Sequence, residues 1–355
     1  MTMTTTGPAA KPALPSWMKP IRPQHVLTAL FLIAYPLVAS PFWTVQIGAQ
    51  ALFLGVIALS LMFLAGYGGM VSLSQMTVAG VAGYMVAVFG TNATHPLFNW
   101  PLWAAVPAAV VIATAFAVLV GIISVRTSGI YTIMITLAIG VAAFYFAQQN
   151  YAIFNGHSGF AGLPSPVGFG LNWRDPMPFY YMSLAVAAVS YFAVLYVSRS
   201  TFGVGLQAIR DNARRMNALG FNVNLHRVVA HGFAGLIASV GGLLYVWMNG
   251  RISPGTIEVG PVIDILVIAV IGGLRHPIGP FVGAVLFVLM ENFAIDLISP
   301  ERFNTLIGLI FLVIVLVSPD GLLGLWRLVS DRVRAGGMAN GGAGRQWRKD
   351  WRKGQ

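Results

Sequence analysis

Long runs of apolar residues with almost no charge dominate this sequence. Only 9% of the 355 residues are charged and 57% are hydrophobic, whereas soluble domains are about 25% charged. Such a chain cannot cover a globule with a water-facing surface, and it is too hydrophobic to be intrinsically disordered. Because it has no cysteine, disulfides and cysteine zinc sites are excluded. The sequence therefore predicts an all-α integral membrane protein.

Ten apolar segments are candidate transmembrane helices, because a helix needs about 20 apolar residues to cross a bilayer. Some are short, so a count of eight to ten is expected. One of them, Met70–Gly90, is rich in glycine and polar residues, and we expect it to be broken or re-entrant. The segments are His25–Ser40, Val45–Gly66, Met70–Gly90, Pro101–Ser124, Ile130–Asn150, Phe179–Ser198, His226–Met248, Ile257–Leu274, Ile278–Ile298 and Phe303–Ser318.

The first segment has a second interpretation, as the apolar core of a signal peptide. The leader before it is long, and Val38–Pro41 is a poor cleavage site. We therefore expect His25–Ser40 to be retained as a span.

The basic residues predict the orientation of the spans. If the N-terminus is cytoplasmic and all ten segments cross, every basic residue except Arg174, Arg251 and Arg302 falls on the inner side. This is the positive-inside pattern, and it places both termini in the cytoplasm. The net charge of +11 then indicates a cytoplasmic face rather than binding to nucleic acid.

Three parts of the chain follow from this layout. Residues 1–24 form a cytoplasmic tail, residues 25–320 a transmembrane domain, and residues 321–355 a basic cytoplasmic tail that would contact anionic lipid. The segment 199–227 is the one long loop predicted on the inner side.

Part of this loop, from Leu206 to Leu219, is predicted to form an amphipathic helix that ends at Gly220. Two interpretations are open: a helix that lies on the bilayer, or one that docks into a groove of a cytoplasmic partner. The apolar face comprises Leu206, Ile209, Ala213 and Met216, and the polar surface comprises Arg210, Asp211, Arg214 and Asn217.

Polar residues within the spans are candidates for a translocation path, because ionisable groups are costly at membrane depth. Asp264 and Glu291 lie in the outer halves of their predicted spans, and Ser72, Ser74 and Gln75 begin the glycine-rich segment. A structural role is open for all five, since carboxyl groups pair with neighbouring helices, and Ser and Gln side chains hydrogen-bond between helices.

Four blocks of sequence resemble, in the same order, the permease subunits of branched-chain amino acid ABC importers of the LivM type. Gly69–Tyr84 is similar to the early "SLGH" segment of that family, and Asn155–Pro164 to its outer glycine-rich loop. Thr201–Val223 is similar to its cytoplasmic coupling loop, and Ile263–Ala284 to its late glycine-rich segment. Together the blocks cover about residues 45–320.

The sequence departs from the family pattern at several positions. Ser74 stands where glycine is usual, Gln75 where histidine is frequent, and Asp264 where glutamate is usual. Arg214–Asn217 replaces a stretch richer in Glu and Ala, and Arg275–Pro277 interrupts a glycine-containing turn. The first three departures bear on the choice of solute, and the fourth on the choice of ATPase.

The resemblance implies a passive permease subunit in a bacterial cytoplasmic (inner) membrane. Its partners would be two cytoplasmic ABC ATPases, a second permease of the LivH type and an extracytoplasmic solute-binding protein. The solute would be a branched-chain amino acid or a similar small polar molecule, since related permeases also carry urea or short amides. Residues assigned to ATPase coupling are Leu206, Ile209, Arg210, Asp211, Asn212, Ala213, Arg214, Met216 and Gly220.

Other classes of function are less consistent with the sequence. The chain has no G-x-x-x-x-G-K-[ST] motif and no metal-ligand spacing such as H-E-x-x-H, so we expect no cofactor, metal site or catalytic residue. A channel or secondary carrier that works alone remains the alternative, although it would leave the amphipathic loop helix without a purpose.

Overall fold

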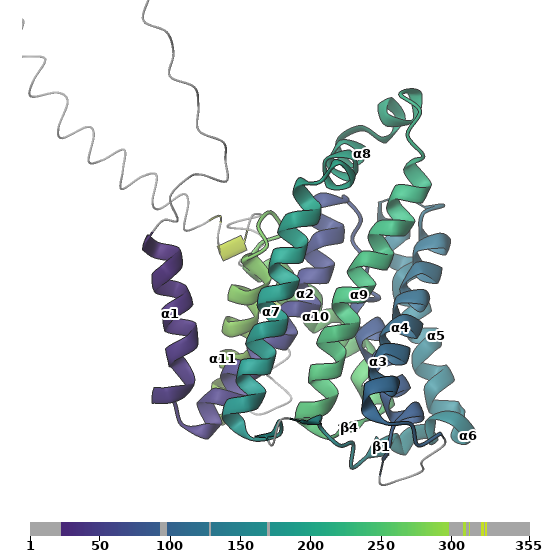
Figure 1. The fold of residues 1–355 in the computed structure, drawn as a ribbon. Helices are drawn as coiled ribbons and strands as arrows, with labels where there is room; N and C mark the ends of the chain where they lie inside the picture. The colour runs from purple at the N-terminus through teal and green to yellow at the C-terminus, as the bar shows by residue number, and fades with distance from the viewer. Residues whose placement is uncertain are drawn as a thin grey trace, which may run out of the picture.

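The structure is a computed structural model that describes residues 23–92, 98–127, 129–168 and 171–297, and a few positions between 308 and 324. These residues form a bundle of helices with two short antiparallel sheets (Figure 1). The helices are α1 (Pro23–Val38), α2 (Gln50–Met62), α3 (Gln75–Phe89), α4 (Leu102–Ser124), α5 (Ile130–Gln149), α6 (Tyr151–Phe154), α7 (Pro176–Arg199), α8 (Thr201–Ala218), α9 (Val223–Asn249), α10 (Val259–Gly272) and α11 (Gly279–Leu297).

Shorter elements extend or connect these helices. The π-helical turns η2 (Trp43–Ala49) and η3 (Phe63–Tyr67) lengthen α2 at its two ends, and the 3-10 turns are η4 (Gly156–Ser158) and η5 (Pro254–Ile257). The strands pair as β1 (Phe160–Ala161) with β4 (Arg251–Ile252), and β2 (Val167–Gly168) with β3 (Leu171–Asn172).

Five helices in the described part of the chain are long and apolar enough to cross a membrane. They are Trp43–Tyr67 (η2, α2 and η3 together), α4, α5, α7 and α9, and each corresponds to a predicted span. The segments predicted as spans 3, 8 and 9 form the shorter apolar helices α3, α10 and α11, and the first forms the 16-residue α1. Phe303–Ser318 and both tails lie outside the fully described ranges, so the count of ten and the orientation of the termini stay predictions.

The segment Met70–Gly90 is broken, as its composition indicated. Helix α3 begins only at Gln75, and the residues from Gly68 to Ser74 are not helical. Met70, Ser72 and Ser74 are nevertheless buried. The bundle therefore covers this non-helical backbone, which is the condition under which a membrane protein tolerates it.

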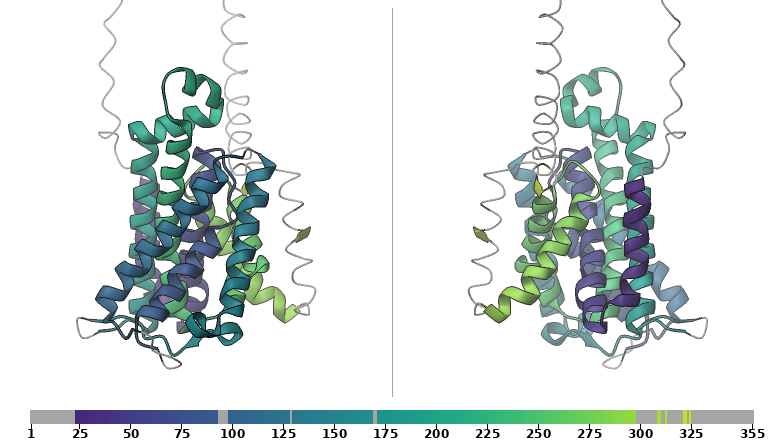
Figure 2. Two further views of the ribbon diagram at one scale, coloured as in Figure 1. Left: turned by 90° about the vertical axis from the view of Figure 1, so that its right-hand side faces the viewer. Right: turned by 90° about the vertical axis from the view of Figure 1, so that its left-hand side faces the viewer.

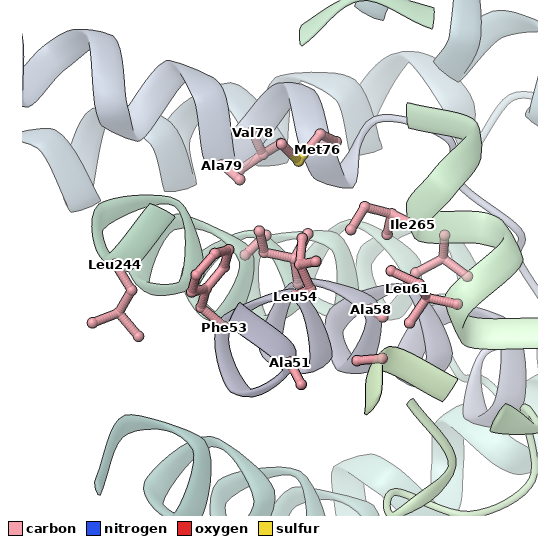
Figure 3. Packing of buried hydrophobic residues seen from close by; sticks show 14 of the residues in the cluster. Ala51, Phe53, Leu54, Ala58, Leu61, Met76, Val78, Ala79, Leu244 and Ile265 are labelled. Carbon is pink, nitrogen blue, oxygen red and sulfur yellow. The ribbon is translucent and has the colours of Figure 1, made fainter. Parts of the chain in front are cut away.

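The core of the bundle lies around α2. Buried side chains of α2 meet those of α3, α9 and α10, and α11 packs on the same cluster (Figure 3). Glycines allow close approach of backbones: a Cβ on Gly242 of α9 would overlap the backbone of Ala79 in α3. Without a hydrophobic drive between helices in lipid, such small-residue contacts supply much of the packing energy.

The outer helices bury one narrow stripe each. In α4 the buried positions Ala105, Ala109, Ala113 and Ala117 recur every fourth residue, whereas Val111 and Leu119 are exposed. This spacing follows the helical period of 3.6 residues and aligns small residues on the face that packs on the bundle. The remaining faces of α4 are available to lipid or to another subunit.

Helix α1 lies at the edge of the bundle (Figure 1) and is held there by tyrosines. Pro36 has no N–H, so the carbonyl of Leu32, four residues earlier, loses its helical donor. The hydroxyl of Tyr180 in α7 donates to that carbonyl at 3.0 Å, and the hydroxyl of Tyr181 donates to Ile33 O at 3.1 Å. In lipid the Tyr180 bond replaces the one that the proline removed, and the Tyr181 bond adds a second attachment.

The two ends of the bundle differ. Helix α8 lies at one end, together with the α4–α5 and α10–α11 turns, whereas α6 and the β1–β4 pair lie at the other (Figures 1 and 2). We refer to these as the α8 end and the β1–β4 end.

Candidate functional site

The predicted loop helix exists as α8, and both of its ends have recognisable causes. Ser200 is the N-cap, and its hydroxyl accepts a hydrogen bond from the Gly203 N–H at 3.3 Å. At the other end Gly220 has a φ of +87°, and the N–H of Phe221 bonds to Met216 O at 3.1 Å. The predicted helix end at Gly220 is therefore confirmed, since glycine reaches this backbone conformation at low cost.

The sequence did not predict that α8 is kinked at Asn212. This residue has a non-helical backbone, with φ −156° and ψ 90°. Its side-chain oxygen accepts a hydrogen bond from the Arg215 N–H at 2.9 Å, which is the N-cap contact that starts a helix. Asn212 therefore divides α8 into a first half that follows α7 and a second half that leads to α9. The signal was present in Asp211 and Asn212, because both residue types favour helix starts over helix interiors.

The apolar face of α8 is covered by the chain itself. Leu206 is 0% exposed and packs with residues of α2, η3 and α9, while Ile209 at 1% and Met216 at 8% pack together with Val223. These side chains are therefore already covered within the chain, and their assignment to ATPase coupling stays a prediction. Periodicity had identified a face that needs burial, but not which surface buries it.

The opposite surface of α8 and of the following turn is exposed. Asn212, Arg214 and Arg215 are exposed, and the apolar side chains of Leu219 and Leu225 are 68% and 57% exposed. Phe221 is also exposed, and its ring lies edge-on to His226. Exposed arginines and exposed apolar side chains therefore occur together in the second half of α8 and in the turn that follows it.

Arg210 joins α8 to the bundle. Its Nη1 donates a hydrogen bond to the carbonyl oxygen of Gly66, at the end of η3. Its Nε and Nη2 each lie 3.0 Å from Oδ1 of Asp211. Two residues assigned to ATPase coupling therefore make contacts within this chain.

The three polar residues at the start of the glycine-rich segment form one buried cluster. The hydroxyls of Ser72 and Ser74 are 2.9 Å apart, and the Ser60 hydroxyl of α2 donates to Oε1 of Gln75 at 3.0 Å. The backbone N–H of Leu73 donates to the hydroxyl of Thr136 in α5 at 3.0 Å. The last two contacts join this segment to α2 and α5, which fits the structural interpretation that polar side chains join helices.

The two membrane carboxylates lie together, which their separate positions in the sequence did not indicate. Asp264 of α10 and Glu291 of α11 are close enough to interact electrostatically, and Nε2 of Gln50 donates to Oε2 of Glu291 at 3.1 Å. Gln50, at the start of α2, was not predicted. Among the described residues no hydrogen bond joins this trio to the Ser72–Gln75 cluster, so the predicted path residues form two groups.

Most of the chain matches one known protein family. A model of the family described as "Branched-chain amino acid transport system / permease component" matches residues 44–316. The chain belongs to this family of membrane permeases.

Individual relatives are distant but cover most of the chain. It is 23% identical to the LivM high-affinity branched-chain amino acid permease protein of Escherichia coli over 84% of this chain and 75% of LivM. It is 24% identical to the corresponding BraD protein of Pseudomonas aeruginosa over 70% of this chain and 81% of BraD. The nucleoside ABC transporter permease protein NupC of Lactococcus lactis is also 24% identical, over 64% of this chain and 74% of NupC. No solved structure matches the chain.

Family membership fixes the general role of the molecule. This permease is a multi-pass membrane protein and a transport component, not an enzyme. Among the residues that the structure describes, no group of three or more His, Cys, Asp or Glu side chains is placed to hold a metal ion.

Proposed function

We propose that this permease is one half of the membrane pore of an ATP-driven importer. With a second permease of the LivH type it forms the translocation path for branched-chain amino acids or similar small polar solutes across a bacterial inner membrane. The observation that carries this proposal is the α8 segment, a basic and partly apolar projection at one end of an apolar bundle. The family match to a permease component supports it.

Two ATPase subunits dock at the α8 end. The chain has no phosphate-binding G-x-x-x-x-G-K-[ST] motif, so energy must come from partners. The α8 end carries exposed Arg126 and Arg275 in addition to the arginines of α8. This distribution supports the assignment of the α8 end to the cytoplasm.

The docking surface is the exposed side of the second half of α8 and the turn after it. Leu219, Phe221 and Leu225 provide apolar contact area, and Arg214 lies beside them. An apolar centre with a charged rim is the usual composition of a specific interface. The buried residues Leu206, Ile209 and Met216 support this surface from within.

A solute-binding protein delivers its cargo at the β1–β4 end. Here the β1–β4 pair ties the segment after α5 to the turn after α9, and Leu163 N bonds to Gly250 O at 3.1 Å. Asn155, with a left-handed φ of 57°, donates its side-chain N–H to Gly159 O at 2.6 Å. These contacts support a firm platform, on which Tyr151 and Ile153 are 70% and 44% exposed.

The solute passes groups that bind it weakly. Of the path residues proposed from the sequence, Ser72, Ser74, Gln75 and Glu291 have hydrogen-bond partners within the chain, and Asp264 lies near Glu291, a group of like charge. Weak binding suits an importer whose selectivity lies in a separate binding protein, because a strong internal site would slow release. The named relatives include permeases for branched-chain amino acids and for nucleosides. Transport assays with leucine, isoleucine, valine, urea, short amides and nucleosides would identify the solute.

Two substitutions at opposite ends test this arrangement. Leu219→Asp adds a charge to the proposed ATPase surface, so the ATPases should no longer co-purify with the permease, while the binding protein still binds it. Ile153→Asp should do the reverse. Membrane levels of both variants serve as the folding control. Unchanged co-purification of the ATPases with Leu219→Asp would show that they dock elsewhere.

A further inference from the structure

Two segments that are distant in the sequence, residues 66–69 and the α10–α11 turn, meet at the α8 end of the bundle. Gly66 lies in the last turn of the second span, and a Cβ on it would overlap the carbonyl oxygen of Leu274 in the α10–α11 turn. Gly69, with a φ of +66°, opens the break before α3. This meeting point, formed by Gly66, Gly69 and Leu274, is called the glycine junction below.

Arg210 reaches from α8 to the glycine junction. Besides its hydrogen bond to Gly66 O, its methylene groups lie against Gly69, where a Cβ would come within 2.5 Å of Arg210 Cγ. Asp211 holds the guanidinium at Nε and Nη2. Because the guanidinium is planar and rigid, fixing two of its nitrogens also fixes the direction of the third, Nη1.

The Gly66 carbonyl is available because the second span ends there. The N–H groups of Gly69 and Met70 bond to Ala65 O and Leu64 O instead. The last carbonyls of a helix lack partners within the helix, and a side chain from elsewhere satisfies this one. The hydrogen bond from Arg210 to Gly66 therefore exists because the second span ends at this point.

The ion pair between Arg210 and Asp211 contributes orientation more than stability. The Arg210 and Asp211 side chains are 40% and 68% exposed, and ion pairs in such positions add little to stability. The pair instead fixes the position of the Arg210 guanidinium. The glycine junction is continuous with the break from Gly68 to Ser74, which contains Ser72 and Ser74 of the buried polar cluster and whose Leu73 N–H bonds to the Thr136 side chain instead of a helical carbonyl.

We propose that Arg210 is a positioning residue that transmits movement of α8 to the break before α3, and that its contacts with Gly66 and Gly69 stay closed while α8 moves. The inference rests on the proposed coupling of α8 to partner ATPases. A segment that has already left the helix absorbs changes in φ and ψ more readily than an intact span. The close fit of Arg210 on Gly69 leaves little slack, so displacement of α8 displaces the break.

The first experiment uses the full complex of this permease, the second permease and the ATPases, reconstituted in vesicles with loaded binding protein. For Arg210→Ala we expect the ATPases to co-purify and to hydrolyse ATP, while solute taken up per ATP hydrolysed falls about fivefold or more, the scale of a typical coupling free energy. Arg126→Ala removes another exposed arginine, from the α4–α5 turn, and should leave the ratio unchanged.

Each result of this experiment is decisive. An unchanged ratio for Arg210→Ala would overturn the proposal, as would loss of ATPase co-purification in that variant, because Arg210 would then belong to the docking surface. Failure of the unmodified permease to co-purify with ATPases would instead contradict the proposed function itself.

The second experiment replaces the contact by a covalent bond that can be opened. A Cβ on Gly69 would lie 3.3 Å from Arg210 Cβ, close to the usual Cβ–Cβ separation of about 3.5–4.5 Å in disulfides. The chain has no cysteine of its own. In Gly69→Cys/Arg210→Cys we expect the oxidised protein to transport with the normal ratio and the reduced protein to be uncoupled.

Gly69→Cys alone shows whether the left-handed position tolerates a side chain. Equal ratios in the oxidised and reduced double variant would overturn the proposal, since the link would then make no difference. Loss of transport on oxidation alone would also overturn it, because the contact would have to open during the cycle.

Discussion

Two groups of helices in this permease have similar hydropathy but different surroundings. In the most apolar window of the second span, Trp43–Tyr67, 83% of the residues are buried, and in α9 the share is 67%. In α4, α5 and α7 it is only 22–28%. Hydropathy thus identifies spans but not their place in the bundle, since lipid and a protein core accept the same side chains. Glycine distinguishes the groups, because it occurs where backbones approach closely: the second span has three glycines and α9 has four, whereas α4 and α5 have one each and α7 has none.

The largest effect is expected at the centre. Gly242→Val places a side chain where a Cβ would already overlap the backbone of Ala79. Because backbone cannot move aside, we expect a cost above the usual overpacking range of about 1–3 kcal/mol. We expect little folded protein in detergent, measured by size-exclusion chromatography and thermal unfolding. Ala115→Val on the exposed face of α4 is the matched control and should unfold at the normal temperature. Equal behaviour of the two variants would remove the distinction between centre and periphery.

A smaller effect is expected where α5 holds the break before α3. Thr136→Val removes the acceptor of the Leu73 N–H and leaves a buried donor unsatisfied, which costs about 1–3 kcal/mol. The free energy of unfolding, measured by denaturation in mild detergent, should fall by this amount. If it does not fall, the hydrogen bond that α5 accepts from the break before α3 contributes nothing to stability.

The attachment of α1 should be weaker still. Tyr180→Phe deletes the hydroxyl that donates to Leu32 O, and a single hydrogen bond contributes about 0.5–1.5 kcal/mol net. Limited proteolysis should cut near α1 faster, while the unfolding of the remaining bundle changes little. Tyr181→Phe is a useful companion, because the Tyr181 ring is more exposed. Unaltered proteolysis of both variants would mean that packing alone holds α1.

The smallest effect separates a structural role from a path role. Thr77 is fully buried, and its hydroxyl has no hydrogen-bond partner among the described residues. In Thr77→Val we expect no loss of stability and normal uptake, because an apolar group of the same shape replaces a buried hydroxyl that has no hydrogen bond to lose. Uptake lost without a loss of stability would instead place Thr77 against the solute.

Much of the fold could be predicted from composition and periodicity. All five long helices were predicted, as were the break before α3 and the end of α8 at Gly220. Two features were not, namely the kink at Asn212 and the burial of Leu206, Ile209 and Met216 within the chain. A repeat of apolar residues identifies a face that must be buried, but it carries no information on whether the same chain or a partner covers it.

The candidate site was predicted only in part, because a sequence pattern does not show which segments pack together. Asp264 and Glu291 were selected independently, as charges at membrane depth, and their proximity depends on how α10 packs beside α11. Their neighbour Gln50 lies more than 200 positions away in the sequence. Pairings of this kind depend on tertiary packing and could not be read from one sequence.

The alternative of a channel or carrier that works alone is separated from the present account by one measurement. The permease is reconstituted in vesicles, first with its second permease only and then with the ATPases, ATP and loaded binding protein. We expect accumulation of solute against its gradient only in the complete system, and none in the first. Sustained uphill uptake without an ATP-hydrolysing partner would contradict the view that α8 receives its movement from outside this chain.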